Sequence, residues 1–270
     1  MPELAEVQTV RDVLKKQILN KKIKDIKILY DKIIENDINE FKDKLINHEF
    51  IDIKRKGKYL IFETKDNYLI SHLRMEGKYF IKPINDTIEK HEHIIFYFDS
   101  FTLRYHDTRK FGRMKLINKN ELDEYFKDLG PDANTYKDYE HLYKIIKNKR
   151  LPIKSILLDQ SIIAGLGNIY VDEVLFKSKI NPNTLGINIT LDNVKTLLDS
   201  SNIILTNAIK YKGTTIRSYT SSLGVKGEYQ NYLQVHTKVN VPCPICSTPI
   251  VKTRVGGRGT YFCPKCQKEK

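Results

Sequence analysis

Two C-x-x-C pairs near the end of the chain constrain its folding more than any other feature. Cys243 and Cys246 form one pair and Cys263 and Cys266 the other, with sixteen residues between the pairs, and the 270 residues include only these 4 cysteines. Each pair brings two thiolates together on a tight turn, and two such turns complete the tetrahedron that zinc prefers. Four protein ligands leave no position for water. The sequence therefore predicts one structural Zn²⁺ ion, rather than a disulfide framework or four unligated thiols.

The segment between the pairs is expected to form a β-hairpin that turns at Gly256-Gly257. Such a hairpin would expose Lys252, Arg254 and Arg258, whose charges suit contact with phosphate groups. Zinc ribbons also bind other proteins, so this motif alone leaves the partner open.

The charge balance indicates an anionic partner. Lys and Arg number 46 against 33 Asp and Glu, a formal net charge of +13. Such an excess favours nucleic acid, an anionic surface or an acidic protein. An AT-rich genome would also raise the lysine count, but it would tend to raise Asp, Glu and Asn as well. We therefore expect nucleic-acid binding.

No segment resembles a membrane helix or a signal peptide. With 40% apolar residues the chain can bury a core, yet no run approaches the ~20 apolar residues that span a bilayer. Glu3, Glu6 and Asp12 stand where a signal peptide would be basic and then apolar. We expect a soluble protein of the cytoplasm, with no membrane partner.

Apolar spacing divides the chain into a strand-rich and a helical part. Residues 5–19 have helical spacing, and from Ile23 to about Leu116 the period falls toward two, which predicts an antiparallel sandwich. Strands are expected at 22–30, 50–64, 68–81, 93–98 and 101–106, with a short helix at 38–47. Helices are expected at 119–130, 138–149, 153–160, 168–178 and 190–211. Gly130-Pro131 marks a boundary, and 213–234 is expected to be a surface loop.

The residue after Met1 is a proline, which is common by chance at a chain start. Removal of Met1 would leave Pro2 as a secondary amine, and an α-amino group titrates near ~8. Such an amine can attack a sugar carbon and form an iminium, with Glu3 beside it as a proton shuttle.

Seven segments taken together resemble the formamidopyrimidine-DNA glycosylase family, bacterial enzymes that excise oxidised purines. They span the chain in order: MPELAEV, GKYLIF, HLRMEGKY, KHEHI, DTRKFGR, LLDQSIIAGLGNIYVDEVLF and GGRGTYFCPKCQ. The resemblance implies an α+β multidomain fold. Its expected parts are an N-terminal antiparallel β-sandwich with flanking helices (1–130), a helix–two-turn–helix DNA-binding domain (131–235) and a zinc finger (236–270), with DNA in a basic cleft between the two main domains.

The same resemblance implies a base-excision repair enzyme that is both DNA glycosylase and abasic-site lyase. Pro2 matches the nucleophile that forms a Schiff base with the sugar, and Glu3 matches the acid that opens the sugar ring and protonates the leaving group. Lys58 matches a lysine that assists elimination and holds a phosphate. Arg258 matches a residue linked to the second of the β,δ-elimination steps.

Further residues match DNA contacts of that family. Met75, Arg109 and Phe111 match the trio that fills the gap left by the flipped nucleotide, although core packing is the ordinary explanation for Met75 and Phe111. Phosphate-contacting positions are matched by His72, His91, Lys149, Lys154 and Asn168. The histidines could also be ordinary surface residues, and the GLGN segment before and at Asn168 could be a tight turn. Glu6 matches a residue near the lesion pocket.

The chain departs from the family pattern at a few positions. Ala5 and Thr108 stand where proline is usual, and Lys110 where arginine is frequent. None of them is a nucleophile, a proton donor or a zinc ligand. The segment 217–225, which would cover a flipped purine, lies in the family's variable region.

Two rival functions stand beside oxidised-purine repair. An endonuclease VIII-like glycosylase would prefer oxidised pyrimidines, but Leu4 and the Met75, Arg109 and Phe111 set argue against that branch. A non-catalytic zinc-ribbon DNA-binding protein is disfavoured because Pro2 and the other catalytic positions are all present. The expected partner is duplex DNA that contains an oxidised base, bound by a monomer in a bacterial cytoplasm.

Overall fold

The computed structural model describes residues 1–214 and 226–268. It divides into two compact units, the first formed by Met1–Lys127 with Lys212–Gly227, and the second by Asp128–Tyr211 with Glu228–Lys270. The helical segment and the cysteine hairpin therefore belong to the same compact unit. The domain boundaries expected at residues 131 and 236 remain a prediction. In the described part of the chain, no helix is long and apolar enough to span a membrane.

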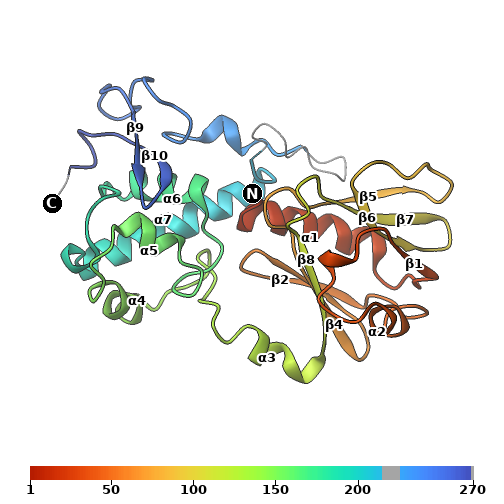
Figure 1. Ribbon diagram of the computed structural model, residues 1–270. Coiled ribbons are helices and arrows are strands. Elements are labelled where there is room, and N and C mark those ends of the chain that lie inside the picture. The colour runs from red at the N-terminus through yellow and green to blue at the C-terminus, as the bar shows by residue number, and fades with distance from the viewer. Residues whose placement is uncertain (215–225, 269–270) are drawn as a thin grey trace. The chain divides into compact units, whose positions relative to one another are not determined.

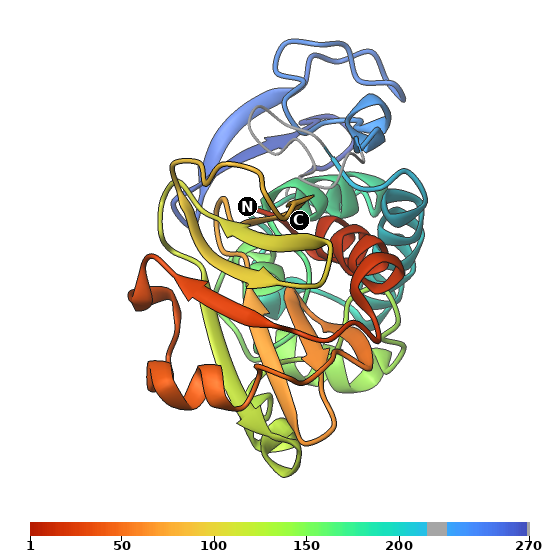
Figure 2. The same ribbon diagram turned by 90° about the vertical axis from the view of Figure 1, so that its right-hand side faces the viewer.

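The first unit is a sandwich of two four-stranded antiparallel sheets (Figures 1 and 2). One sheet has the order β1 (Asp25–Ile28), β6 (Glu92–Tyr97), β7 (Phe101–His106) and β5 (Lys78–Pro83). The other has the order β2 (Asp52–Lys56), β3 (Tyr59–Glu63), β4 (Asn67–His72) and β8 (Arg113–Asn118). Alternate side chains of both sheets, among them Phe62 and Phe96, meet in one core. The predicted sandwich is confirmed.

Helix α1 (Leu4–Ile18) closes one side of this core. Val7, Val10, Leu14 and Ile18 recur at helical spacing and are buried, as the sequence predicts. Contacts with β2 and β3 hold the helix against the sandwich (Figure 2). The N-terminal residues are thereby anchored to the sheet that carries Lys58.

Several elements of the first unit differ from the sequence expectations. The strand expected at 50–64 is two strands, β2 and β3, and the strand expected at 68–81 is also two, β4 and β5. Strand β8 was missed, although Met114 and Leu116 alternate toward the core. The helix expected at 38–47 is shorter, α2 (Ile38–Asp43), and begins where the Asp37 carboxylate accepts the N–H groups of Asn39 and Glu40 at 2.9 and 3.0 Å. The helix expected at 119–130 is split into a 3₁₀ turn (Lys119–Glu121) and α3 (Leu122–Tyr125).

The second unit contains the helices and one hairpin. The helices are α4 (Tyr139–Ile146), α5 (Ile153–Leu158), α6 (Asn168–Lys177) and α7 (Leu191–Lys210), and the hairpin is β9 (Val251–Val255) with β10 (Arg258–Phe262). Of the loop expected at 213–234, the part 229–232 forms a 3₁₀ turn instead, and 215–225 lies outside the described residues. The α+β fold, with sandwich, helical segment and cysteine hairpin, agrees with the prediction.

Candidate functional site

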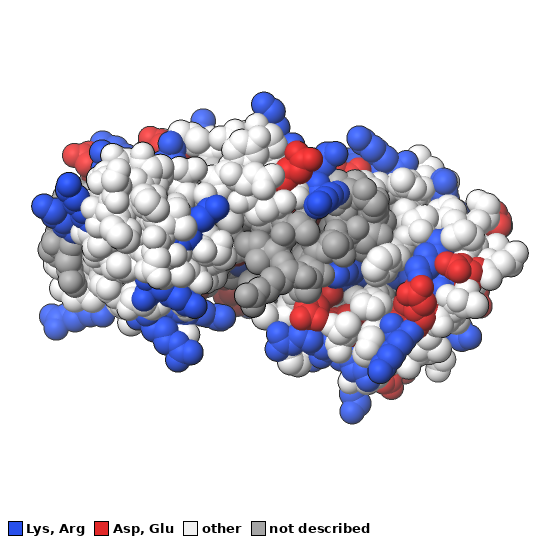
Figure 3. All heavy atoms as spheres, turned by 90° about the horizontal axis from the view of Figure 1, so that it is seen from above, with Lys and Arg blue, Asp and Glu red and all other residues white. Residues whose placement is uncertain are grey.

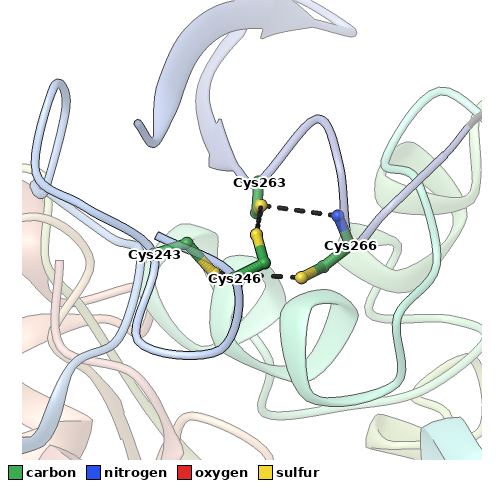
Figure 4. A group of neighbouring side chains, drawn as sticks. All are labelled: Cys243, Cys246, Cys263 and Cys266. Atoms are coloured by element: carbon green, nitrogen blue, oxygen red, sulfur yellow. Dashed lines mark hydrogen bonds between the residues drawn. The ribbon is translucent and has the colours of Figure 1, made fainter. Parts of the chain in front are cut away.

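The four cysteines converge on one point (Figure 4). Their Sγ atoms all lie within 4.8 Å of one another; Cys246 and Cys263 are 3.4 Å apart, and Cys243 and Cys266 are 3.9 Å apart. A zinc ion with bonds of about 2.3 Å separates tetrahedral ligands by about 3.8 Å, so the donor set fits Zn²⁺. The N–H of Cys266 donates to the Cys263 Sγ at 3.4 Å, a contact that favours the thiolate. The predicted structural zinc site is present.

The hairpin turns at Gly256-Gly257 as expected, with φ values of +54° and +76°. Left-handed backbone at both turn residues suits the twist of a two-residue hairpin, and glycine adopts it without strain. Lys252, Arg254 and Arg258 are all exposed. The zinc knuckles and the hairpin thus present Arg258 at the first position of β10.

The N-terminal residues are buried around the carboxylate of Glu6. Pro2 is buried and Glu3 is 2% exposed, whereas Met1 is 49% exposed. The Glu3 N–H donates to Glu6 Oε2 at 2.9 Å, while Glu6 Oε1 accepts the N–H and hydroxyl of Thr214 at 2.7 and 3.1 Å. Glu6 therefore fixes the backbone at Glu3 and also holds the chain at Thr214.

Lys58 lies in the two-residue turn between β2 and β3 and is 5% exposed. Gly57 adopts a φ of +55° in this turn. Arg55 donates to the Gly57 carbonyl at 2.8 Å and to Gln8 Oε1, on α1, at 2.9 Å. Arg55 thereby connects the turn that carries Lys58 to the helix that begins beside Pro2.

His72 is held neutral at the end of β4. Burial, together with the nearby cations Arg74 and Lys58, lowers its pKa from the usual 6.5 to about 3. The Arg74 N–H donates to His72 Nδ1 at 2.9 Å, so the neutral ring carries its proton on Nε2. A neutral imidazole with an Nε2–H can donate to a phosphate oxygen without a charge of its own.

Met75 and Phe111 are exposed, at 36% and 47%, so core packing does not explain them. The Arg109 guanidinium lies 4.7 Å from the centre of the Phe111 ring. The buried Asp107 shapes this loop by accepting the N–H groups of Arg109 at 3.0 Å and Gly112 at 2.8 Å. Sequence reasoning missed Asp107, although an acidic residue at the start of a tight loop is a signal for backbone capping.

Thr108, one of the departures from the family pattern, connects two loops. Its hydroxyl donates to the carboxylate of Glu76, the neighbour of Met75. The loop with Met75 and the loop with Arg109 and Phe111 are therefore joined by a side-chain hydrogen bond.

His91, half-buried with a φ of +72°, follows a loop held by Arg104. Arg104 is 1% exposed and donates to the carbonyls of Asp86 and Thr87 at 2.8 and 2.7 Å and to Glu92 Oε2 at 2.8 Å. Arg104 belongs to none of the motifs named above, although a charge at an inward position of a strand is a signal for a buried ion pair.

In the second unit, Asn168 begins α6 as expected and donates from Nδ2 to the Gly259 carbonyl at 2.9 Å. Lys149 is half-buried. The phosphate contact expected for Lys154 is not supported: this side chain is 0% exposed, and its ammonium donates to Asp172 Oδ1 at 2.7 Å. We exclude Lys154 from the proposed DNA contacts because a saturated, buried ammonium cannot reach a phosphate.

The predicted site residues are thus divided between the two units. Pro2, Glu3, Lys58, His72, His91 and the Met75, Arg109 and Phe111 set belong to the first unit, and Asn168, Lys149 and Arg258 belong to the second. On the face shown in Figure 3, Lys and Arg side chains are scattered among Asp and Glu side chains. The basic cleft between the domains remains a prediction.

Three family descriptions match the chain in sequence. They are the formamidopyrimidine-DNA glycosylase N-terminal domain at residues 1–114, its H2TH domain at 129–220, and the zinc finger found in FPG and IleRS at 242–268.

Relatives match over nearly the full length. The formamidopyrimidine-DNA glycosylase of Ligilactobacillus salivarius is 49% identical over 99% of each chain, and that of Streptococcus pneumoniae is 44% identical over 99% of each. A solved complex of Lactococcus lactis Fpg with DNA that contains an abasic site has a TM-score of 0.95 and 42% identity, covering 99% of this chain and 100% of the other. A Lactococcus lactis Fpg mutant bound to Fapy-dG DNA has the same TM-score of 0.95 at 41% identity, with the same coverage. The chain belongs to the formamidopyrimidine-DNA glycosylase family.

Proposed function

We propose that this chain repairs duplex DNA by removing oxidised purines, 8-oxoguanine and formamidopyrimidines, and by cutting the abasic site with Pro2 as nucleophile. Among the contacts described above, the exposed set formed by Met75, Arg109 and Phe111 is the observation that carries this proposal. Exposed apolar side chains on loops with an ordered backbone are suited to enter a base stack, where they offset part of the cost of flipping a nucleotide.

The reaction requires the amine of Pro2, so Met1 is removed first, and its exposure leaves it accessible. The Pro2 nitrogen attacks C1′, the bond from C1′ to the damaged base breaks, and the base leaves with a proton. Glu3 opens the sugar ring and delivers protons. The iminium that results draws electrons away from C2′.

Two eliminations follow from the iminium. Loss of the C2′ proton breaks the bond between C3′ and its phosphate oxygen, and loss of the C4′ proton then breaks the bond between C5′ and its phosphate oxygen. Water hydrolyses the remaining imine and returns the Pro2 amine. Lys58 assists the first elimination and holds a phosphate, and Arg258 assists the second.

The remaining predicted contacts hold the DNA backbone. His72 donates from Nε2, and His91, Lys149 and Asn168 contact further phosphates. The contact proposed for Asn168 is supported by its position as the first residue of α6, because backbone N–H groups at a helix N-terminus attract anions. Since these contacts are ionic or charge-assisted, affinity should fall steeply with salt.

The zinc ion has a structural role because its four ligands are all protein thiolates. It keeps the hairpin folded, and the hairpin presents Arg258. One chain contains every group named in this mechanism, so a monomer is sufficient. We place this activity in the bacterial cytoplasm, on nucleoid DNA, in keeping with the bacterial relatives.

Borohydride trapping tests the proposal. The purified protein is incubated with a duplex that carries one 8-oxoguanine opposite cytosine, and sodium borohydride reduces the iminium to a stable covalent adduct. We expect an adduct with the unaltered chain and none with Pro2→Gly. An adduct formed only on a thymine glycol duplex would reassign the chain to oxidised pyrimidines. Tight DNA binding without an adduct on either lesion would leave a non-catalytic DNA-binding protein.

A further inference from the structure

A buried ion pair contacts Gly259, the second residue of β10. Lys154, on α5, and Asp172, on α6, are both about fully buried, and their charged groups are 2.7 Å apart. The Lys154 ammonium also donates to the carbonyl of Gly259 at 3.0 Å and to the hydroxyl of Thr260 at 2.8 Å. These three acceptors match the three N–H donors of an ammonium. All three donors of the Lys154 ammonium are therefore used in hydrogen bonds to Asp172 and to the hairpin.

Asp172 extends the same network to two further segments. Its second oxygen, Oδ2, accepts Nδ1–H of His236 at 2.8 Å and the N–H of Tyr261 at 3.3 Å. Asp172 lies four residues after Asn168 on α6, so both side chains point to one face of the helix. The carboxylate thereby joins α5, α6, the chain at His236 and strand β10. Figure 1 shows β10 beside α6, in agreement with the contacts between the two elements.

The carbonyl of Gly259 is the point where this network meets Asn168, one of the proposed DNA-binding residues. It accepts hydrogen bonds from both Lys154 Nζ and Asn168 Nδ2. The Thr260 hydroxyl, which accepts from Lys154, donates to the carbonyl of Arg258 at 2.9 Å. The backbone at Arg258 is thus held through the two residues that follow it, Gly259 and Thr260, while its side chain is exposed.

The hairpin turn also fits closely against α5. A Cβ atom added at Gly256 would lie 2.3 Å from the Ser155 hydroxyl oxygen, so the Ser155 side chain would have to move to make room for it. Ser155 follows Lys154 directly, so the turn and strand β10 both contact the same end of α5. Arg258, two residues after Gly256, is therefore positioned by the contacts that Gly256, Gly259 and Thr260 make with α5 and α6, as well as by the zinc knuckles.

We propose that Lys154 and Asp172 are positioning residues that fix Arg258 relative to Asn168 for the second elimination step. This inference rests on the proposed function, because it takes Arg258 as the residue that assists that step. The pair itself does not touch DNA. It acts through the Gly259 carbonyl and the Thr260 hydroxyl, and a shift of the hairpin backbone of about 1 Å would be enough to slow a reaction that depends on Arg258.

The test is the ratio of the two elimination products from a duplex that contains one abasic site. In single-turnover reactions, the unaltered chain is expected to give mostly the product of both eliminations. Lys154→Met should lower the rate of the second elimination by about tenfold or more relative to the first. Trapping through Pro2 should persist, and one zinc per chain should remain bound.

Two further variants separate positioning from folding. Lys154→Met alone leaves a buried carboxylate without its main partner and is therefore destabilising, whereas adding Asp172→Asn removes that charge and keeps an acceptor for His236 and Tyr261. Positioning predicts that the double variant recovers stability but not the product ratio. Thr260→Val, which removes a single hydroxyl at nearly constant volume, should shift the ratio in the same direction by a smaller amount.

Arg104→Met is the matched control, because it breaks the buried Arg104–Glu92 ion pair of the first unit. It should lower stability and leave the product ratio unchanged. A normal ratio in the folded, zinc-loaded double variant would overturn the proposal, as would a ratio that follows stability in all variants, Arg104→Met included. Absence of trapping or strand cutting by the unaltered chain would instead contradict the proposed function.

Discussion

Glu6 and Thr214 are joined by two hydrogen bonds, although 208 residues separate them in the chain. The same carboxylate accepts the N–H of Glu3, so one buried side chain orders the backbone at the proposed proton donor and in the segment that follows α7. Gly213 is required beside it, because its φ is +78° and a Cβ there would lie 2.6 Å from Glu6 Oε1. Glu6 is therefore a positioning residue for Glu3.

We expect Glu6→Gln to slow adduct formation by about tenfold or more, because an amide offers one acceptor oxygen where the carboxylate offers two. Hydrogen bonds to a charged group contribute about 1.5–3 kcal/mol, so the free energy of unfolding should fall by a similar amount. Trapping rates and urea unfolding measure the two effects. Asp12→Asn, on a more exposed turn of α1, is the control and should change neither by more than about twofold or ~0.5 kcal/mol.

Met75→Ala and Phe111→Ala should reduce base excision without unfolding the protein. Because both side chains are exposed, each change should alter the free energy of unfolding by less than about 1 kcal/mol. Loss of an inserted side chain should slow excision by about tenfold or more in single-turnover assays, since flipping costs a few kcal/mol. Ile88→Ala, which truncates a side chain that is 40% exposed in the same unit, should have no such effect. Equal excision by all three variants would contradict the proposed insertion.

Thr108→Val tests the connection between the two loops. The variant keeps the shape of the side chain but removes the hydroxyl that donates to Glu76. An exposed hydrogen bond contributes about 0.5–1.5 kcal/mol, so excision should slow by a few-fold. Glu76→Gln keeps an acceptor for this hydroxyl and should have less effect. If the Thr108→Val and Glu76→Ala effects simply add in the double variant, the two loops act independently.

The pH dependence of stability should reflect His72. Burial and two nearby cations lower its pKa in the folded chain to about 3, whereas an unfolded histidine titrates near 6.5. Between these values the unfolded chain binds the additional proton, so the contribution of neutral His72 is fully present above pH ~6.5 and is lost as the pH falls toward 3. His72→Asn, which retains an acceptor for the Arg74 N–H, should reduce the slope of unfolding free energy between pH 7 and pH 5. An unchanged slope would mean that His72 is not held neutral.

Removal of zinc should disable the hairpin and leave the sandwich folded. The cysteine pairs pack on a small apolar cluster, so much of the stability of the two knuckles comes from the bound ion. We expect a chelator, or Cys246→Ser, to release one zinc per chain and to lower affinity for an abasic-site duplex by at least about tenfold. The sandwich contains no zinc ligand, and its circular dichroism in the strand region should remain. Full DNA affinity in the zinc-free protein would contradict the structural role of the ion.

Local patterns in the sequence determined much of this protein. The spacing of the four cysteines defines the zinc site, the helical period of residues 5–19 defines α1, and the alternating strands define a sandwich, because these signals depend on neighbours within a few residues. The joint occurrence of seven motifs identified the family.

Tertiary structure decided which charged side chains face solvent and which are buried. Lys154 lies in a basic stretch and was expected to contact phosphate, but it is paired with Asp172, 18 residues away, and with Gly259, 105 residues away. The partners of Arg104 and the contact between Glu6 and Thr214 are set by distant segments in the same way. A buried charge is stable only where distant segments supply its partners, and no local pattern in the sequence records which segments those are.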